Sequence, residues 1–200
     1  MELTEALRRR RMVRSYLPRP VHGEALDRVL RAACSGPSAG FSQGLDLVVL
    51  QGPDQTSRLW DASLPPERRP AFPWPALVDA PVVVVVLARP ASYTERYSEP
   101  DKASTGLGAS ETAWPVPYWY VDCGVALGLM LLAAVDEGLG AAFFGLFGNE
   151  GRVLRALGVP GGHRAVGAMT LGYPAEADRP SSSARRPRRP PEEIIHRGRW

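Results

Sequence analysis

YVDCGVALGLMLLAAVDEG, at residues 120–138, is the most distinctive stretch of the sequence. It is apolar almost all the way round a helical projection, and this predicts a central helix buried within the domain. Its longest uncharged run, Cys123 to Val135, is shorter than the ~18–20 residues that a membrane span needs, so we expect no membrane partner. Gly124 and Gly128 fall on one face of this helix and predict the close approach of a second helix.

On either side of this helix, the sequence alternates short helical and short extended patterns. The continuous β-branched run from Val82 to Leu87 indicates a central strand buried on both faces. Residues 89–117 contain turn signals without a clear period, so we expect a lid at 90–117, or a short helix hidden within it. Further strands are expected at 45–50, 141–144 and 165–171, further helices at 2–11, 23–34 and 150–157, and a proline-rich loop at 52–75.

The composition is that of an ordinary globular protein. The 200 residues suit a single domain, 1–200, with a substantial core. A net charge of +3 does not make the whole surface attractive to nucleic acid. The two cysteines, Cys34 and Cys123, are expected as reduced thiols in the core, which fits a cytoplasmic protein. The first residues, MELTE, are acidic and polar, unlike a signal peptide.

Two clusters of arginine lie at opposite ends of the chain, at 8–14 and 185–189. Guanidinium groups recognise phosphate through paired, charge-assisted hydrogen bonds, so folding that joins the clusters would create an anion site. A third segment, GPSAGFSQ at 36–43, is small, polar and loop-like, and lets the backbone approach a flat ligand closely. Together these segments predict one bound phosphorylated cofactor.

Several segments, in this order along the chain, resemble the motifs of the FMN-dependent nitroreductase family. They are RRMVRSY at 10–16, PSAGFSQ at 37–43, the long helix ending in GLG at 138–140, FGLF at 144–147, LGYP at 171–174 and RPRRPPEEIIH at 186–196. Nearly the whole chain is covered, except roughly 52–75 and 90–116. The sequence departs from the family at Met12, where Ser is usual, at Phe41, where Asn is common, and at Gly145, where some members carry Glu.

The resemblance implies an α+β fold of three layers, with a central mixed sheet flanked by helices. It also implies an intertwined homodimer in which FMN lies at the interface and a C-terminal arm, residues 175–200, embraces the partner. A nearly all-apolar helix and an arm that ends in apolar residues would both find burial in such an interface.

The same resemblance assigns roles to individual residues. Arg10, Arg14, Arg186 and Arg188 would hold the FMN phosphate, because a dianion needs several donors to offset its desolvation. The backbone of Gly145 and Leu146 would present an N–H to flavin N5. Pro37, Ser38, Ala39 and Gly40 would wrap the flavin edge or ribityl chain, Gln43 would hydrogen-bond the flavin, and Arg11, Met12 and Phe41 belong to the same cofactor-binding set.

The implied function is that of an FMN-dependent oxidoreductase. In a ping-pong cycle, NADH or NADPH would give a hydride to FMN, and a small electron-poor acceptor of nitroaromatic or quinone type would then take the electrons. No side chain is expected to act as a catalytic acid or base, because the cofactor carries the chemistry. The three histidines lack metal-ligand spacing, so no metal is expected.

Other interpretations stay open. A flavin-dependent dehydrogenase of a biosynthetic intermediate, reoxidised by oxygen, would use the same cofactor. An anion-binding or nucleic-acid-binding module would use the arginine clusters with salt-dependent affinity, although no recognised nucleic-acid motif is present. A degenerate family member would dimerise without holding flavin. The aromatic stretch at 114–120 is either a wall over the flavin or part of the dimer interface.

Overall fold

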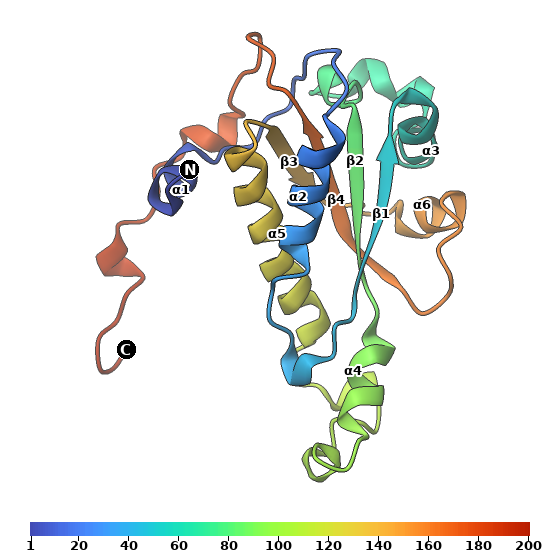
Figure 1. Cartoon of the computed structure of the whole chain (residues 1–200), viewed down its shortest axis with the longest axis vertical. Helices are drawn as coiled ribbons and strands as arrows, with labels where there is room; N and C mark the ends of the chain where they lie inside the picture. The colour runs from blue at the N-terminus through green and yellow to red at the C-terminus, as the bar shows by residue number, and fades with distance from the viewer.

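The computed structural model describes residues 1–200 and arranges them in three layers around a four-stranded sheet (Figure 1). The strands lie in the order β1 (Leu45–Gln51), β2 (Val82–Ala88), β4 (Arg164–Gly172) and β3 (Gly140–Phe144). The predicted central strand is therefore confirmed, since β2 has neighbours on both sides. The three predicted layers are confirmed as well.

All three ladders of the sheet are antiparallel, so the expectation of a mixed sheet is wrong. The connection between β1 and β2 leaves and returns at the same end of the sheet, where Gln51 pairs with Val82. The Gly52 N–H also donates to the carbonyl of Pro81 at 2.9 Å. A connection that returns to the end it left cannot give parallel neighbours. Parallel pairing is limited to one isolated bridge, between Met12 and Ala141.

Alternate residues of β2 face two separate cores, because side chains of a strand point to opposite sides of the sheet. Val82, Val84 and Val86 pack with α2 (Gly23–Ala33) and α5 (Tyr118–Asp136). The intervening residues, from Val83 to Leu87, pack with α3 (Pro53–Ser63) and α6 (Glu150–Ala156). Every residue of β2 is buried, which explains why its sequence is β-branched without alternation.

Helix α5 lies along the sheet with one side buried and the other open to solvent. Cys123, Met130 and Ala134 are fully buried in the core. Its 19 residues are long and apolar enough to cross a membrane, yet these contacts are those of a core helix. On the outer side, Val121 and Val125 are 44% and 40% exposed. The expectation of a helix buried all round is therefore wrong for a single chain.

Two regions expected as loops contain helices that begin at proline. Residues 52–75 form α3 and two 3₁₀ turns, η2 (Pro66–Ala71) and η3 (Pro75–Leu77). Residues 89–117 form α4 (Pro90–Tyr97) and two further turns, η4 (Ala103–Thr105) and η5 (Glu111–Ala113). Pro53 and Pro90 occupy the first helical position, where the missing N–H costs nothing and the fixed φ favours the helix. The short helix expected as an alternative within 90–117 is confirmed.

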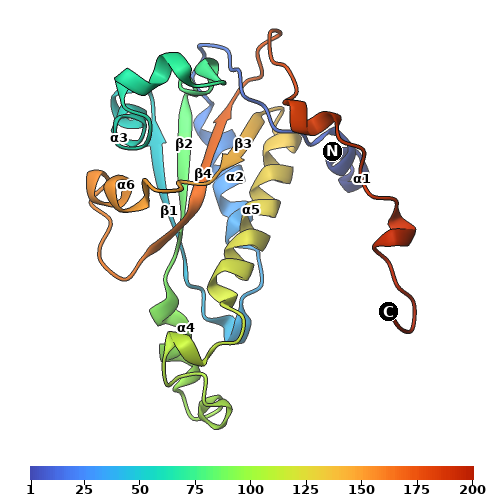
Figure 2. The ribbon, with the colours of Figure 1, turned by 180° about the vertical axis from the view of Figure 1, so that it is seen from behind.

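The N-terminal helix and the first part of the C-terminal arm lie side by side, away from the sheet, and the end of the arm extends beyond them (Figures 1 and 2). Helix α1 (Leu3–Arg9) is shorter than the predicted 2–11 and buries only Ala6. The C-terminal arm carries η6 (Ser182–Arg185) and η7 (Pro191–Glu193), and residues 182–200 are all exposed. Ile194, Ile195 and Trp200 are among these exposed residues. Within its own chain, the arm has no core to bury them in.

Candidate functional site

The 10–16 segment, RRMVRSY, runs beside the edge strand β3. Met12 bridges Ala141, the Val13 N–H donates to the Ala141 carbonyl at 2.8 Å, and the Phe143 N–H donates to Met12 Sδ at 3.5 Å. The far end of the segment is fixed by Tyr16, whose buried hydroxyl lies 2.7 Å from Thr170 Oγ1. The arginines of this segment therefore lie beside the first residues of β3 and the chain that leaves β4, whereas a turn follows the far end of β3.

That turn is Gly145 and Leu146, two residues assigned to the flavin by the family resemblance. At about 3.3 Å per residue, Gly145 lies roughly 13 Å along the strand from Ala141. The backbone N–H groups of Gly145 and Leu146 donate to no other atom of the chain. Leu146 itself is buried. Buried backbone N–H groups are nearly always paired, so these two are suited to a bound acceptor.

The arginines of the two clusters differ in whether an acidic side chain pairs with them. Arg11 is paired with Asp178, and Arg189 with Glu193. No carboxylate lies within 4.0 Å of the four arginines expected to hold phosphate, Arg10, Arg14, Arg186 and Arg188, and the neighbouring Arg8 and Arg185 also lack one. The guanidinium of Arg14 instead lies over the ring of Trp74, 4.9 Å from its centroid. Unpaired guanidinium groups remain available to an anion.

Asp178 fixes the backbone of the 10–16 segment. Its carboxylate is 2% exposed and accepts the N–H groups of Arg14 and Ser15 at 2.8 and 3.0 Å, in addition to the Arg11 guanidinium. In this chain Arg11 is thus held by a buried acid. Asp178 is distant from Arg14 in sequence, yet it fixes the position of Arg14 through this backbone hydrogen bond.

The 37–43 loop, PSAGFSQ, lies at the other end of α5. The Ala39 N–H donates to Asp122 Oδ2 at 2.9 Å, in the first turns of that helix. Within the loop, Ser38 Oγ accepts the Gln43 N–H at 3.0 Å. Phe41 and Gln43 are the only non-glycine residues of the chain with positive φ, 58° and 50°. Phe41 is 71% exposed, so its side chain is presented to solvent by a strained backbone.

One chain does not bring all of the predicted site residues together. The N-terminus contacts the far end of α5, where the Met1 ammonium lies 2.5 Å from Asp136. Asp122 and Asp136 are 14 positions apart on this helix, which at 1.5 Å per residue is roughly 21 Å. The 10–16 segment and the 37–43 loop therefore lie at opposite ends of α5 (Figure 1). Arg186 and Arg188 lie on the exposed C-terminal arm.

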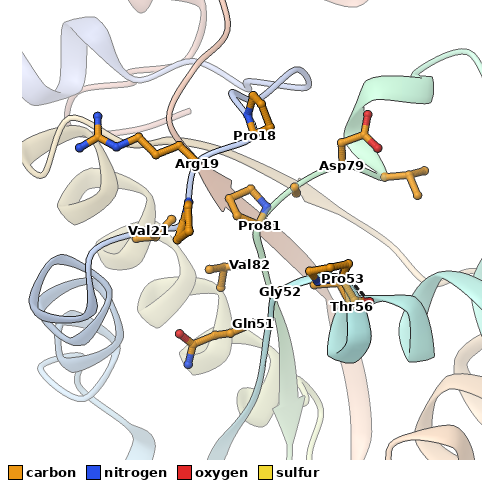
Figure 3. A pocket seen from close by; sticks show the side chains of 13 residues that line it. Pro18, Arg19, Val21, Gln51, Gly52, Pro53, Thr56, Asp79, Pro81 and Val82 are labelled. Carbon is orange, nitrogen blue, oxygen red and sulfur yellow. Dashed lines mark hydrogen bonds between the residues drawn. The ribbon is translucent and has the colours of Figure 1, made fainter.

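Cavities between the elements are small and only partly coincide with these segments. A pocket of about 400 Å³ lies at the end of the sheet and is lined by Gln51, Gly52, Thr56 and Pro81 (Figure 3). It contains none of the residues predicted to bind the cofactor, and the Arg19 side chain points away from it. A pocket of about 160 Å³ does adjoin the loop, between Ser38, Gln43, Tyr93 and Asp122.

Sequence reasoning missed four residues that shape the site, namely Asp122, Asp178, Trp74 and Arg96, and Arg96 Nε donates to the Gly40 carbonyl of the 37–43 loop at 2.8 Å. Asp122 is the only charged residue inside the apolar stretch from Tyr118 to Val135, and that isolation was its signal. Asp178 and Trp74 lie in polar or proline-rich segments with no distinguishing pattern. The aromatic stretch at 114–120 proves to be divided, since Trp114 and Trp119 are buried while Tyr118 is exposed.

Residues 7–173 match the model of the nitroreductase family, and the chain belongs to that family. A protein of Thermus thermophilus named NADH dehydrogenase is 30% identical, over 90% of this chain and 91% of its own. A protein of Bacillus subtilis named FMN reductase [NAD(P)H] is 26% identical, over 98% of this chain and 73% of its own. The solved structure of the hypothetical oxidoreductase YcnD from Bacillus subtilis has a TM-score of 0.75 at 25% identity, covering 100% of this chain and 75% of the other.

Proposed function

We propose that this chain is an FMN-dependent oxidoreductase that oxidises NADH or NADPH and reduces an electron-poor small molecule of nitroaromatic or quinone type. Membership of the nitroreductase family supports the proposal, as do relatives named for NAD(P)H and FMN reduction. The observation that carries it is the pairing pattern of the arginines. Arg10 and Arg14 have no acid partner and lie beside a strand that ends in two unpaired backbone N–H groups.

The residues present fit FMN at its two chemically distinct ends. Arg10 and Arg14 would bind the phosphate, and Asp178 would hold Arg14 in place through its backbone. The N–H groups of Gly145 and Leu146 would hydrogen-bond the flavin near N5. When bound, FMN accepts two electrons with a proton and returns them, which is the chemistry that the protein itself does not supply. The protein therefore contributes binding, orientation and exclusion of water.

The site is completed by a second copy of the chain. The 37–43 loop lies at the other end of α5 from the 10–16 segment, so one bound FMN would take the arginines of one subunit and the loop of its partner. The outer face of α5 supports this arrangement, because Val121, Gly124, Val125 and Gly128 form one stripe at helical spacing. A Cβ added at either glycine meets no atom of its own chain within 4 Å. An apolar stripe of this kind indicates a protein interface.

The exposed arm, residues 182–200, fits the same homodimer. Its apolar residues Ile194, Ile195 and Trp200 find no burial in their own chain and would gain it against the partner. This docking would also bring Arg186 and Arg188 to a phosphate. The arm is thus proposed as both a dimerisation element and a supplier of phosphate ligands.

Anaerobic reduction in a spectrophotometer tests the proposed reaction. NADH or NADPH, added to the FMN-loaded protein, should bleach the flavin bands, and a later addition of a quinone or nitroaromatic should restore them. Double-reciprocal plots of the initial rate against nucleotide concentration, measured at several acceptor concentrations, should be parallel lines, as a ping-pong cycle requires. Failure of both nucleotides to bleach the flavin would contradict the proposal and favour a dehydrogenase that is reduced by its own substrate.

A further inference from the structure

The 37–43 loop has a backbone that it would not adopt by itself. Gly40, Phe41 and Gln43 all have positive φ, at 60°, 58° and 50°. For Phe and Gln this region of backbone space costs free energy, and such strain persists only where the surroundings impose it. Contacts from outside the loop must therefore hold it.

Two such contacts come from α5 and α4. Asp122 Oδ2 accepts the Ala39 N–H at 2.9 Å and the Tyr93 hydroxyl at 2.8 Å. Burial is the main cause that raises the pKa of Tyr93, so its hydroxyl stays protonated and donates. Arg96 Nε, on α4, donates to the Gly40 carbonyl at 2.8 Å. The two contacts hold adjacent residues, Ala39 and Gly40, at the start of the strained turn.

Arg96 is itself oriented for this contact. Its two terminal nitrogens bind both oxygens of Asp101, each at 2.7 Å, and one of them also contacts Glu99 at 3.0 Å. This fork leaves Nε, on the other edge of the guanidinium, for the carbonyl of Gly40. Helix α4 also approaches so closely that a Cβ at Gly40 would lie 2.7 Å from the ring of Tyr97.

We propose that Arg96 and Asp122 are positioning residues for the flavin, holding the 37–43 loop from α4 and α5 in the conformation that binds FMN. The inference rests on the proposed function, because it takes this loop as a cofactor-binding segment. Neither residue is expected to touch the reacting atoms. Without these contacts the loop would relax to an unstrained backbone, and FMN binding would have to restore the strain.

Because these contacts hold a strained loop, their loss should weaken FMN binding more than it lowers the stability of the protein. In the apoprotein, release of the strain offsets part of the lost hydrogen bond, so the melting temperature should change little. The affinity for FMN should change more, because the strained conformation must be rebuilt on binding. One lost charge-assisted hydrogen bond corresponds to a Kd about tenfold higher or more.

The test is titration of full-length apoprotein with FMN, followed by flavin fluorescence, for four variants. Arg96→Gln and Asp122→Ala should each raise the FMN Kd about tenfold. Asp122→Asn should stay within about threefold of the wild type, because the amide oxygen can still accept the Ala39 N–H. Arg89→Gln is the matched control, since Arg89 also lies at α4 but pairs only with Glu95.

A Kd within twofold of the wild type for Arg96→Gln would overturn the inference. So would an equal loss of affinity in Asp122→Ala and Asp122→Asn, because a positioning role requires rescue by the amide. If Asp122→Ala does not fold, Arg96→Gln decides the matter by itself, since it alters contacts at the surface. A wild-type protein that binds no FMN would overturn the proposed function first, before any variant is compared.

Discussion

Asp178 and Arg11 form a salt bridge across 167 positions of sequence, and through it the segment after β4 fixes the arginine-rich N-terminal segment. The carboxylate is nearly inaccessible and also binds the backbone N–H groups of Arg14 and Ser15. Arg11 is half exposed, so a guanidinium group at the surface compensates the charge of the buried Asp178 carboxylate. The salt bridge holds Arg11 against a buried acid, whereas Arg14 has no acid partner.

Asp178→Ala removes the acceptor for two backbone N–H groups and should destabilise the protein by about 2 kcal/mol. For a chain of this size that corresponds to a melting temperature lower by roughly 4–8 °C. Thermal unfolding monitored by circular dichroism measures it. Glu176→Gln, at an exposed position two residues away, is the control and should leave the melting temperature unchanged. Equal melting temperatures for both variants would contradict a stabilising role for Asp178.

Arg14→Ala and Arg188→Ala should each weaken FMN binding at least tenfold while the fold stays intact, because each removes a charge-assisted donor to the phosphate. The measurement is the FMN content of the purified variants together with the Kd of the apoproteins. Arg189→Ala should have little effect, since Arg189 is already paired with Glu193. Stoichiometric flavin in both of the first two variants would show that the phosphate assignment is wrong.

Gly128→Leu should convert the proposed dimer into monomers, because it places a bulky side chain on the exposed outer face of α5. The subunit itself should tolerate the change, because a Cβ added at Gly128 meets no atom of its own chain within 4 Å and Leu favours a helix over Gly by up to about 1 kcal/mol. Sedimentation velocity measures the oligomeric state. Gly151→Leu, at an exposed glycine of α6, should remain dimeric. A dimeric Gly128→Leu variant would place the interface elsewhere.

Thiol titration with an aromatic disulfide at pH 8 should label one cysteine in the native protein and two after denaturation. Cys34 is exposed, against the expectation of a core thiol, whereas Cys123 is buried as expected. Burial, more than the nearby charge of Asp122, raises the pKa of Cys123 from 9.0 to about 12. Its contribution to stability is therefore present below about pH 9 and declines as the pH rises toward 12. Rapid native labelling of both thiols would contradict this burial.

The sequence predicted the elements whose hydrophobic pattern is strong. Val82–Leu87 and residues 120–138 both became core elements, because continuous apolar runs can be satisfied only by burial on several sides. The pattern could not show that one face of α5 stays open in a single chain, since apolar residues look alike whether they face a core or a second subunit. Helix α3 was missed, and α4 was expected only as an alternative to a lid, because Pro53 and Pro90 resemble loop residues, although proline also favours the first position of a helix.

The sequence predicted those parts of the candidate site that are formed by consecutive residues. It did not predict contacts between residues that are distant in sequence. The segments at 10–14 and 37–43 are compact motifs, and each forms a distinct structural unit. Contacts such as Arg11 with Asp178, or Arg96 with Gly40, join residues 56 to 167 positions apart and depend on how α4 and the β4 connection pack. No local pattern encodes them. The division of the site between the two ends of α5 was likewise invisible before the chain was folded.

The proposed function requires that this protein hold FMN. The most direct measurement is the absorbance spectrum of the purified protein, followed by identification of what heat denaturation releases into the supernatant. We expect flavin bands that correspond to about one FMN per subunit, either as purified or after incubation with added FMN. A colourless protein that takes up no FMN would contradict it, and the unpaired arginines would then require a different anion.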